Sequence, residues 1–485
     1  MMIASDLKPI LFVTGLVLSK LSLLMLAPLA MGMAYDEPGY VEFFYTIIVT
    51  QTAAFTMLRW GRQAQFNLSV RGMFMLTTSV WLIACMFGAL PLYRIDHISF
   101  TDAFFETMSG LTTTGSTVLA GLDEMPKSAL LWRSMLQWLG GIGFIVLSVA
   151  ILPFLNVGGM RLFQTESSDW SDKNTPKTKN VASNMLKVYL LLSVFCALAY
   201  HLTGMNWFEA INHAMTTIST GGYSTSDESM AHFSNASHWV GSAFMLLGGL
   251  PFLLLVQSLQ HRDLHYIWRD AQVRGFITLI AVVGGMMSAW LWLHGTFSLE
   301  DALRISIFNI ISIVTTTGYG LTDFSHWGNF TTVLFIFLML VGACSGSTSG
   351  GIKIFRFQLA SGLFTRQLQQ LVHPRGIYPH RYNGRVVSEQ HIRSLVAFIF
   401  AFFFTLILLA SGLALLGLDP VTALSGAMTA LANVGPGLGR VIGPDHNFHL
   451  LPDSAKWLLS FGMLLGRLEV LTVLVLFLPA YWRYR

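Results

Sequence analysis

The chain has 485 residues, of which 53% are hydrophobic and only 11% are charged, with a formal net charge of +4. A typical soluble domain carries about 25% charged residues, so this composition excludes a water-soluble protein and predicts a polytopic membrane protein. The net charge alone says little about partners, and no nucleic-acid partner is expected. The three cysteines, Cys85, Cys196 and Cys344, are spaced for neither a disulfide framework nor a metal site, so we assign them to packing.

Two apolar segments, near residues 9–34 and 38–60, open the chain. Each reaches the roughly 20 residues that a membrane-crossing helix needs. The first exceeds the apolar length of a typical secretory signal, about 7 to 15 residues, which favours a span over a cleaved leader. We therefore expect residues 1–66 to form an accessory pair of transmembrane helices.

A unit then occurs four times, made of a long span, a short helix, a glycine strand and another long span. Self-similarity at this scale dictates the architecture. We place the four pore repeats at residues 67–160, 161–262, 263–375 and 376–485. The predicted fold is an all-α polytopic membrane protein with ten full spans and four half-spans, in which four parallel repeats are arranged with pseudo-fourfold symmetry behind the accessory pair.

The glycine strands read TTTG at 112–115, STGGY at 219–223, TTTGYG at 315–320 and ANVGPG at 432–437. Each follows an apolar helix too short to cross a bilayer, which is typical of a re-entrant pore loop. The short helices open with capping signals at Ser99, Asn206, Ser298 and Asp419. The distance from cap to glycine is 16 residues in copies one, two and four and 20 in copy three, a difference of about one helical turn.

Basic residues indicate the orientation of the repeats. The connectors between units and the two ends of the chain hold 21 of the 29 Lys and Arg residues, so the positive-inside rule places these loops and both termini in the cytoplasm. The glycine strands then enter from the opposite, acid-rich side, where negative charge raises the local concentration of cations.

Four extended strands around one axis can aim rings of carbonyl oxygens inward and replace the hydration shell of a monovalent cation. Glycine is needed where the strand adopts a positive φ, and the C-terminal ends of the short helices add partial negative charge. One such segment alone would be an ordinary helix ending at a glycine. Four copies at nearly constant spacing, with no carboxylate in the strands, instead favour a filter for a weakly held monovalent ion.

The second span of the third unit is interrupted at residues 342–351 by four glycines and four hydroxyl residues. Such a stretch must face protein or water inside a membrane, and we interpret it as a mobile loop that blocks or opens the path below the filter. A phosphate-binding loop is a poor alternative because the Gly-Lys-Ser/Thr ending is absent. A Gly/Ser-rich helix-packing contact is a second alternative.

Arg467 is a charge inside the final span, and Glu469 follows it on a different helix face. Charged residues in a span are expensive and functional by default. We expect Arg467 to project into the pore near the interrupted segment as a positive barrier to cations. A buried structural ion pair is the alternative.

The repeats, the four glycine strands and the GACSGSTSGGIK segment resemble the Trk/Ktr/HKT superfamily of potassium transporters, and most of all its TrkH family of bacterial membrane subunits. The resemblance covers essentially the whole chain. It implies a homodimer in the bacterial inner membrane that binds a TrkA-like, nucleotide-sensing subunit on its cytoplasmic face. It also implies K⁺ as the bound substrate, with no covalent cofactor.

By the same resemblance, K⁺ is held by backbone carbonyls of a filter, and the interrupted segment is the gate. The filter residues are Thr113, Thr114, Gly115, Thr220, Gly221, Gly222, Thr316, Thr317, Gly318, Asn433, Val434 and Gly435. The gate residues are Gly346, Ser347, Thr348, Ser349, Gly350, Gly351 and Arg467. All four copies depart from the TVGYG of potassium channels, so we expect no strict fourfold symmetry and a weaker selectivity.

Two further points complete the sequence-based hypothesis. Seven basic residues in 353–393 predict a docking surface for a cytoplasmic regulator, or alternatively for anionic membrane lipid.

No set of residues predicts an enzyme. The rival function is a secondary transporter that couples K⁺ or another solute to H⁺ or Na⁺, and a membrane receptor or scaffold would not need four filter strands.

Overall fold

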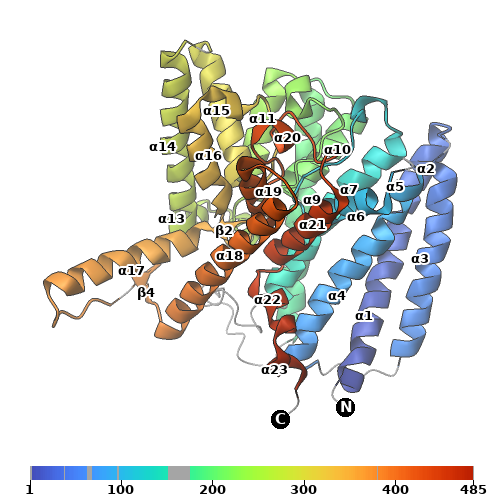
Figure 1. The fold of residues 1–485 in the computed structure, drawn as a ribbon, viewed down its shortest axis with the longest axis horizontal. Coiled ribbons are helices and arrows are strands. Elements are labelled where there is room, and N and C mark those ends of the chain that lie inside the picture. Colours follow the sequence, from blue (N-terminus) through green and yellow to red (C-terminus); the bar gives the residue numbers. More distant parts are fainter. Residues whose placement is uncertain are drawn as a thin grey trace.

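The structure is a computed structural model, and it describes residues 3–37, 39–62, 68–95, 98–150, 175–295, 297–379 and 381–483. Helices make up nearly all of its regular structure (Figure 1). In these ranges the strands are limited to two short pairs, a parallel pair of β1 (Val341–Gly342) with β2 (Ile352–Lys353) and an antiparallel pair of β3 (Arg381–Tyr382) with β4 (Arg385–Val386). The predicted fold class is confirmed.

The accessory pair consists of α1 (Ile3–Leu24), which continues into α2 (Leu26–Ala34), and α3 (Tyr40–Gly61). Helices α1 and α3 lie side by side at one edge of the molecule (Figure 1). Their packing is close, because a Cβ atom on Gly15 would lie 2.9 Å from the carbonyl oxygen of Ala54. Small residues allow membrane helices this approach.

Each of the four repeats contains a first span, a short pore helix and a second span. The first repeat comprises α4 (Val70–Gly88) with α5 (Leu90–Ile95), then α6 (Phe100–Leu111) and α7 (Lys127–Ala150). The second comprises α9 (Thr175–Leu202), α10 (Trp207–Ile218) and α11 (Asn235–Gly248) with α12 (Phe252–His261), and α13 (His265–Arg269) follows it. The third comprises α14 (Ala271–Leu293), α15 (Leu299–Val314), α16 (Asn329–Leu340) and α17 (Ile354–Val372). The fourth comprises α18 (Glu389–Leu415), α19 (Pro420–Ala432), α20 (Gly439–Ile442), α21 (Asp453–Arg467), α22 (Leu471–Leu474) and α23 (Pro479–Trp482).

The described residues include four single turns of 3₁₀ helix, at Leu122–Glu124, Ser229–His232, Phe324–Trp327 and Val475–Phe477. The predicted repeat boundaries at 66/67 and 160/161 lie outside the described residues. So do Arg161, Lys173 and Arg485, three of the 21 basic residues assigned to the connectors and chain ends. The boundary at 262/263 falls just after α12, and the boundary at 375/376 falls between α17 and β3.

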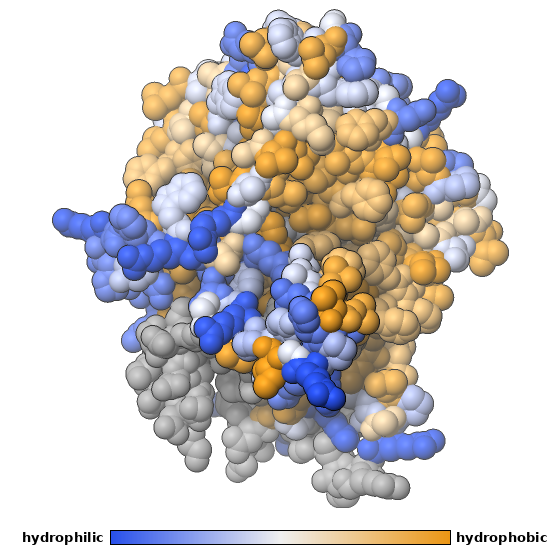
Figure 2. Space-filling view, turned by 90° about the vertical axis from the view of Figure 1, so that its left-hand side faces the viewer, coloured by the Kyte–Doolittle hydropathy of each residue, from blue (hydrophilic) through white to orange (hydrophobic). Residues whose placement is uncertain are grey.

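Seven of the described helices are long and apolar enough to cross a membrane, or nine if each bent pair counts as one span. Figure 2 shows hydrophobic side chains over a broad area across the middle of one face, as a lipid-facing surface requires. The tenth expected span is the interrupted one, in which α16 has only 12 residues. The chain is a multi-pass membrane protein.

The second spans of repeats two and four differ from the sequence prediction of full-length helices. Helices α11 and α12 meet at 95°, and α21 meets the α22 segment at 108°. The first bend lies at Gly249 and Pro251, where proline removes a helical donor. The second lies at Glu469 and Val470, which both have positive φ. Three of the four second spans are therefore broken, although only the third was predicted to be.

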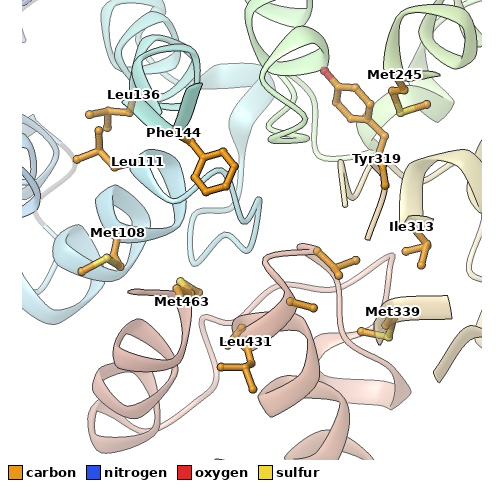
Figure 3. Close-up of a cluster of buried hydrophobic side chains, with 14 of the residues drawn as sticks. Met108, Leu111, Leu136, Phe144, Met245, Ile313, Tyr319, Met339, Leu431 and Met463 are labelled. Atoms are coloured by element: carbon orange, nitrogen blue, oxygen red, sulfur yellow. The ribbon is translucent and has the colours of Figure 1, made fainter. Parts of the chain in front are cut away.

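The hydrophobic core runs through all four repeats rather than within each one. Figure 3 shows buried side chains of the pore helices and second spans around a common centre, among them Leu111, Met245, Ile313 and Leu431. A buried ion pair joins the first repeat to the last, because Lys456 of α21 donates to Asp102 of α6 at 2.5 Å. The chain thus closes into a ring of repeats.

We predict that Lys456→Met destabilises this closure, because it leaves the Asp102 carboxylate buried without its cation. Breaking a buried pair on one side costs about 3–5 kcal/mol, so the midpoint of thermal unfolding in detergent should fall clearly. Arg94→Met is the control, since Arg94 makes an exposed ion pair with Glu42 and exposed pairs contribute little. Equal melting temperatures for the two variants would contradict the prediction.

Candidate functional site

Each of the four pore helices begins at its predicted cap. The side chains of Ser99, Asn206, Ser298 and Asp419 accept hydrogen bonds from backbone N–H groups of the first turn of α6, α10, α15 and α19, at 2.9–3.2 Å. At Asn206 the full capping box is present, because Glu209 accepts from the Asn206 N–H in return. These caps satisfy donors at the helix starts.

The four strands after the pore helices share one backbone conformation. Thr113, Thr220, Thr316 and Asn433 have φ of 52°, 52°, 57° and 55°, and the glycines two residues later have φ of 89°, 79°, 85° and 115°. Asparagine tolerates the left-handed region, but threonine is β-branched and strained there. Such strain persists where the surrounding structure imposes it, typically at functional sites. The backbone is thus more symmetric than the divergent sequence of copy four predicts.

The glycines place the strands in a closed ring. A Cβ atom on Gly115 would collide with the carbonyl oxygen of Gly221, one on Gly222 with that of Thr317, and one on Gly318 with that of Val434. The circle closes at Gly435, where a Cβ atom would lie 3.0 Å from the carbonyl oxygen of Thr114. Each glycine therefore faces the carbonyl that precedes the glycine of the next copy, and no side chain fits between them.

The carbonyl oxygens of this ring are largely without protein partners. Gly221 accepts a hydrogen bond of 2.6 Å from Gln137 Nε2. For the carbonyls of Thr114, Thr317 and Val434, all three in buried residues, the described part of the chain supplies no donor. Since buried backbone carbonyls are almost always paired, these oxygens are suited to bind water or a cation.

The residue after each ring glycine contacts the preceding copy. Tyr223 donates to the carbonyl of Glu106 at 2.7 Å, and the Tyr319 hydroxyl lies 2.5 Å from Thr216 Oγ1. Ser116 donates to the Gly435 carbonyl at 2.7 Å, and Pro436 lies against Gly318. These contacts run around the ring in the opposite direction to the glycine contacts, so every copy is held on both sides.

A buried ion pair behind the first strand was missed by the sequence reasoning. Arg133 Nε of α7 lies 2.9 Å from Glu106 Oε1 of α6, and both side chains are at most 1% exposed. Arg133 also donates to Ser224 O at 3.2 Å and covers the Tyr223 ring at 4.2 Å. Glu106 accepts from Val118 N at 2.9 Å. The signal was available, because both are charges inside apolar segments, the criterion that selected Arg467.

The interrupted segment lies directly under the ring. Strands β1 and β2 close its ends into a compact loop. Gly350 N donates to Thr316 Oγ1 at 2.7 Å, and Thr348 Oγ1 donates to Ile218 O at 3.1 Å. A Cβ atom on Gly350 would collide with the carbonyl oxygen of Ala432. The loop therefore touches copies two, three and four at their inner ends.

The other loop residues hold its shape. Ser347 donates to Cys344 O at 2.7 Å and shares a hydrogen bond of the same length with Ser349. Gly346 and Gly351 have φ of 77° and 67°, and the Gly346 carbonyl accepts from Phe252 N at 3.0 Å. The segment is therefore a built structure with satisfied hydroxyls and not a simple packing stripe of small residues.

Arg467 binds the loop through hydrogen bonds. Its side chain is 1% exposed, and it donates to Thr348 O at 2.8 Å and to Gly140 O at 3.1 Å. The guanidinium covers the Phe144 ring at 4.3 Å. Among the described residues Arg467 makes no ion pair, because Glu469 pairs instead with Arg356 at 2.7 Å. The alternative of a structural ion pair at Arg467 therefore finds no support there.

Lys353 and Arg356 differ from the sequence prediction, which placed them in a cytoplasmic connector. Both are buried beneath the loop, with 1% and 0% exposure. The sequence analysis assigned both residues to the connector, because no long apolar run follows the loop. The structure instead brings three cations to the inner side of the ring: Arg356 pairs with Glu469, and Lys353 and Arg467 bind the loop.

Acidic side chains lie on the outer side, in the segments that follow strands three and four. Burial and the neighbouring Asp323 carboxylate raise the pKa of Asp445 above its usual value. Asp323 itself caps a turn and lies 3.4 Å from His326 Nε2. Described residues contain no group of three or more metal-binding side chains, so the candidate cation ligands are the backbone carbonyls of the ring.

Comparison with known proteins gives one consistent result. A family model described as TrkH, cation transport protein, matches residues 40–484. The chain is 46% identical to the Trk system potassium uptake protein TrkI of Halomonas elongata, covering 98% of this chain and 97% of that protein. It is 36% identical to TrkH of Escherichia coli strain K12, covering 97% and 98%. The crystal structure of the potassium transporter TrkH from Vibrio parahaemolyticus superimposes with a TM-score of 0.91 at 36% identity, covering 98% and 99%.

The tyrosine contacts of the ring predict a stability effect. Tyr319→Phe removes the hydroxyl that bridges copies two and three at Thr216 and Thr217. A lost hydrogen bond of this kind costs about 0.5–1.5 kcal/mol, so thermal unfolding of the purified protein should begin at a lower temperature. Tyr266→Phe, at an exposed position outside the ring, should leave the melting curve unchanged. If Tyr319→Phe also leaves it unchanged, the hydroxyl does not brace the ring.

Proposed function

The chain belongs to the TrkH family of cation transport proteins, and on that premise we propose that it is the pore-forming subunit of a potassium uptake system. The family transports ions and is not a family of enzymes. The K⁺ assignment draws on relatives that are named potassium uptake proteins. The membrane is the bacterial inner membrane, with both termini in the cytoplasm, and Figure 1 places the two termini on the same side of the molecule.

The closed ring of carbonyl oxygens is the observation that carries this proposal. Three of its four carbonyls have no donor among the described residues, and glycines keep side chains out of the space between copies. A ring of carbonyls replaces the hydration shell of a monovalent cation. The pore helices end at the ring, so their C-terminal partial charges favour a cation as well.

The proposed filter comprises the three residues of each strand from the left-handed residue to the ring glycine. In the four copies these are Thr113, Thr114 and Gly115; Thr220, Gly221 and Gly222; Thr316, Thr317 and Gly318; and Asn433, Val434 and Gly435. The hydrogen bond from Gln137 to Gly221 makes copy two weaker as a cation ligand. This asymmetry supports a selectivity below that of a channel with four identical strands.

We assign the gate to residues 346–351 together with Arg467. The loop closes the inner side of the ring through contacts with three copies, and Arg467 ties its Thr348 carbonyl to the Gly140 carbonyl of repeat one. A cation that leaves the ring therefore meets first the loop and then a buried positive charge. Flux requires both to move.

Control by a cytoplasmic, TrkA-like nucleotide-sensing subunit acts through the β3–β4 hairpin in this proposal. Asn383 of the hairpin donates to Asp270 at 3.0 Å and accepts from Ala271 N at 2.9 Å, at the start of α14. The next residue, Gln272, accepts from Ser345 N of the loop at 2.8 Å. The turn at the start of α14 thus connects a solvent-exposed hairpin to the gate. The assembly is a homodimer in this proposal, and anionic membrane lipid is the alternative ligand of the basic surface.

The filter assignment predicts that Gly222→Ala abolishes the preference for K⁺ over Na⁺. The new methyl group would collide with the Thr317 carbonyl and turn it out of the ring. Gly121→Ala is a matched control, because Gly121 has a similar φ of 74° but nothing within 4 Å of a Cβ atom. Ion fluxes into proteoliposomes measure the effect. If both variants retain the wild-type K⁺ to Na⁺ ratio, the glycine ring is not the filter.

Removal of the positive barrier gives a second prediction. Arg467→Gln should raise K⁺ flux several-fold in the absence of a regulator, because it removes a buried charge and weakens the hydrogen bond to the loop at Thr348. Arg94→Gln is the control for loss of a positive charge, because Arg94 is exposed and pairs with Glu42. Unchanged flux in a folded, inserted Arg467→Gln protein would remove Arg467 from the gate.

A further inference from the structure

Lys353 is a buried cation that contacts the loop, and neither the filter nor the docking surface accounts for it. Its side chain is 1% exposed. Among the described residues its ammonium donates to oxygens of the loop: the carbonyl of Ser349, the Ser349 hydroxyl at 3.1 Å and the Gly350 carbonyl at 3.3 Å. An ammonium group is a compact monovalent cation, so the loop holds it as carbonyl oxygens hold a monovalent metal ion.

These oxygens belong to the part of the loop that contacts the filter strands. Gly350 donates its N–H to Thr316 of the third strand, and Thr348 binds the second strand and Arg467. Lys353 therefore binds Gly350, which contacts the third strand, and Ser349, which lies between Gly350 and Thr348. If the ammonium leaves, the carbonyls of Ser349 and Gly350 lose a charged donor in a buried place, and the closed form of the loop loses stability.

Lys353 also lies immediately before α17, the helix that leads away from the gate. It occupies the N-cap position of α17 and pairs through β2 with Gly342 of β1. Further along α17, Gln358 accepts a hydrogen bond of 2.6 Å from Tyr382 of the hairpin and donates to Ala271 O at 2.8 Å. Movement of the hairpin is thus passed along one helix to the Lys353 side chain.

We propose that the Lys353 ammonium group holds the gate closed by occupying the oxygens of Ser349 and Gly350, and that opening occurs when displacement of α17 withdraws it. This inference rests on the proposed gate. It assigns to Lys353 a positioning role that is separate from the barrier formed by Arg467. The closed loop is therefore stabilised by a tethered cation, and the release of that cation is the step on which a cytoplasmic regulator acts.

The test is regulator-free K⁺ flux into proteoliposomes for wild type, Lys353→Met and Lys353→Arg. Methionine matches the length of lysine without its charge, so flux should rise several-fold, while arginine should keep the wild-type flux. A residue with only a structural role would lower both flux and melting temperature in Lys353→Met, and that result would overturn the inference. Arg467→Gln is measured in parallel. If it raises flux and Lys353→Met does not, the gate stands and the role of Lys353 falls; if neither does, the gate itself fails.

A second readout does not depend on conduction. Cys344 lies in the loop segment and is fully buried, as are Cys85 and Cys196. In a Cys85→Ala, Cys196→Ala background, a small water-soluble maleimide should modify Cys344 several-fold faster in Lys353→Met than in Lys353→Arg. Equal modification rates would mean that Lys353 does not hold the loop, whatever the fluxes are.

Discussion

The structure depends on one constraint, that backbone carbonyl oxygens inside a membrane need partners. Around the central ring the described part of the chain supplies no donor to three carbonyls, and glycines, strained threonines and four capped helices hold these carbonyls in place. The residues after the glycines brace each copy against its neighbour. In the proposed filter, these carbonyl oxygens coordinate a desolvated monovalent cation.

Buried ion pairs farther from the ring also hold the repeats in place. Glu106 with Arg133 fixes the segment that follows the first strand, and Asp102 with Lys456 closes repeat four onto repeat one. On the inner side the balance changes, because Lys353, Arg356 and Arg467 lie there and only Arg356 of these three forms an ion pair among the described residues, with Glu469. The outer side is acidic. In the proposed mechanism, a cation is attracted on one side of the ring and opposed on the other until the loop moves.

The sequence predicted the repeats, the four caps and the glycine positions because these depend on local chemistry: a capping side chain, a helix length and a residue that tolerates positive φ. It aligned Asn433 with the three threonines, but it did not predict that all four residues share one left-handed backbone conformation, because threonine disfavours that region. The breaks at Pro251 and Glu469 were missed because both lie within otherwise apolar runs. Lys353 was placed in a connector because its burial depends on contacts between residues of the loop and of repeats one and four.

The most direct test of the central claim is cation flux into liposomes that hold the purified wild-type protein, under K⁺, Na⁺ or Li⁺ gradients alone. The ring of carbonyls predicts fast flux that favours K⁺ and needs no second gradient. Slow flux that requires a proton or sodium gradient and does not distinguish the three ions would contradict it. The four strands would then be structural, and a coupled transporter would replace the channel-like pore.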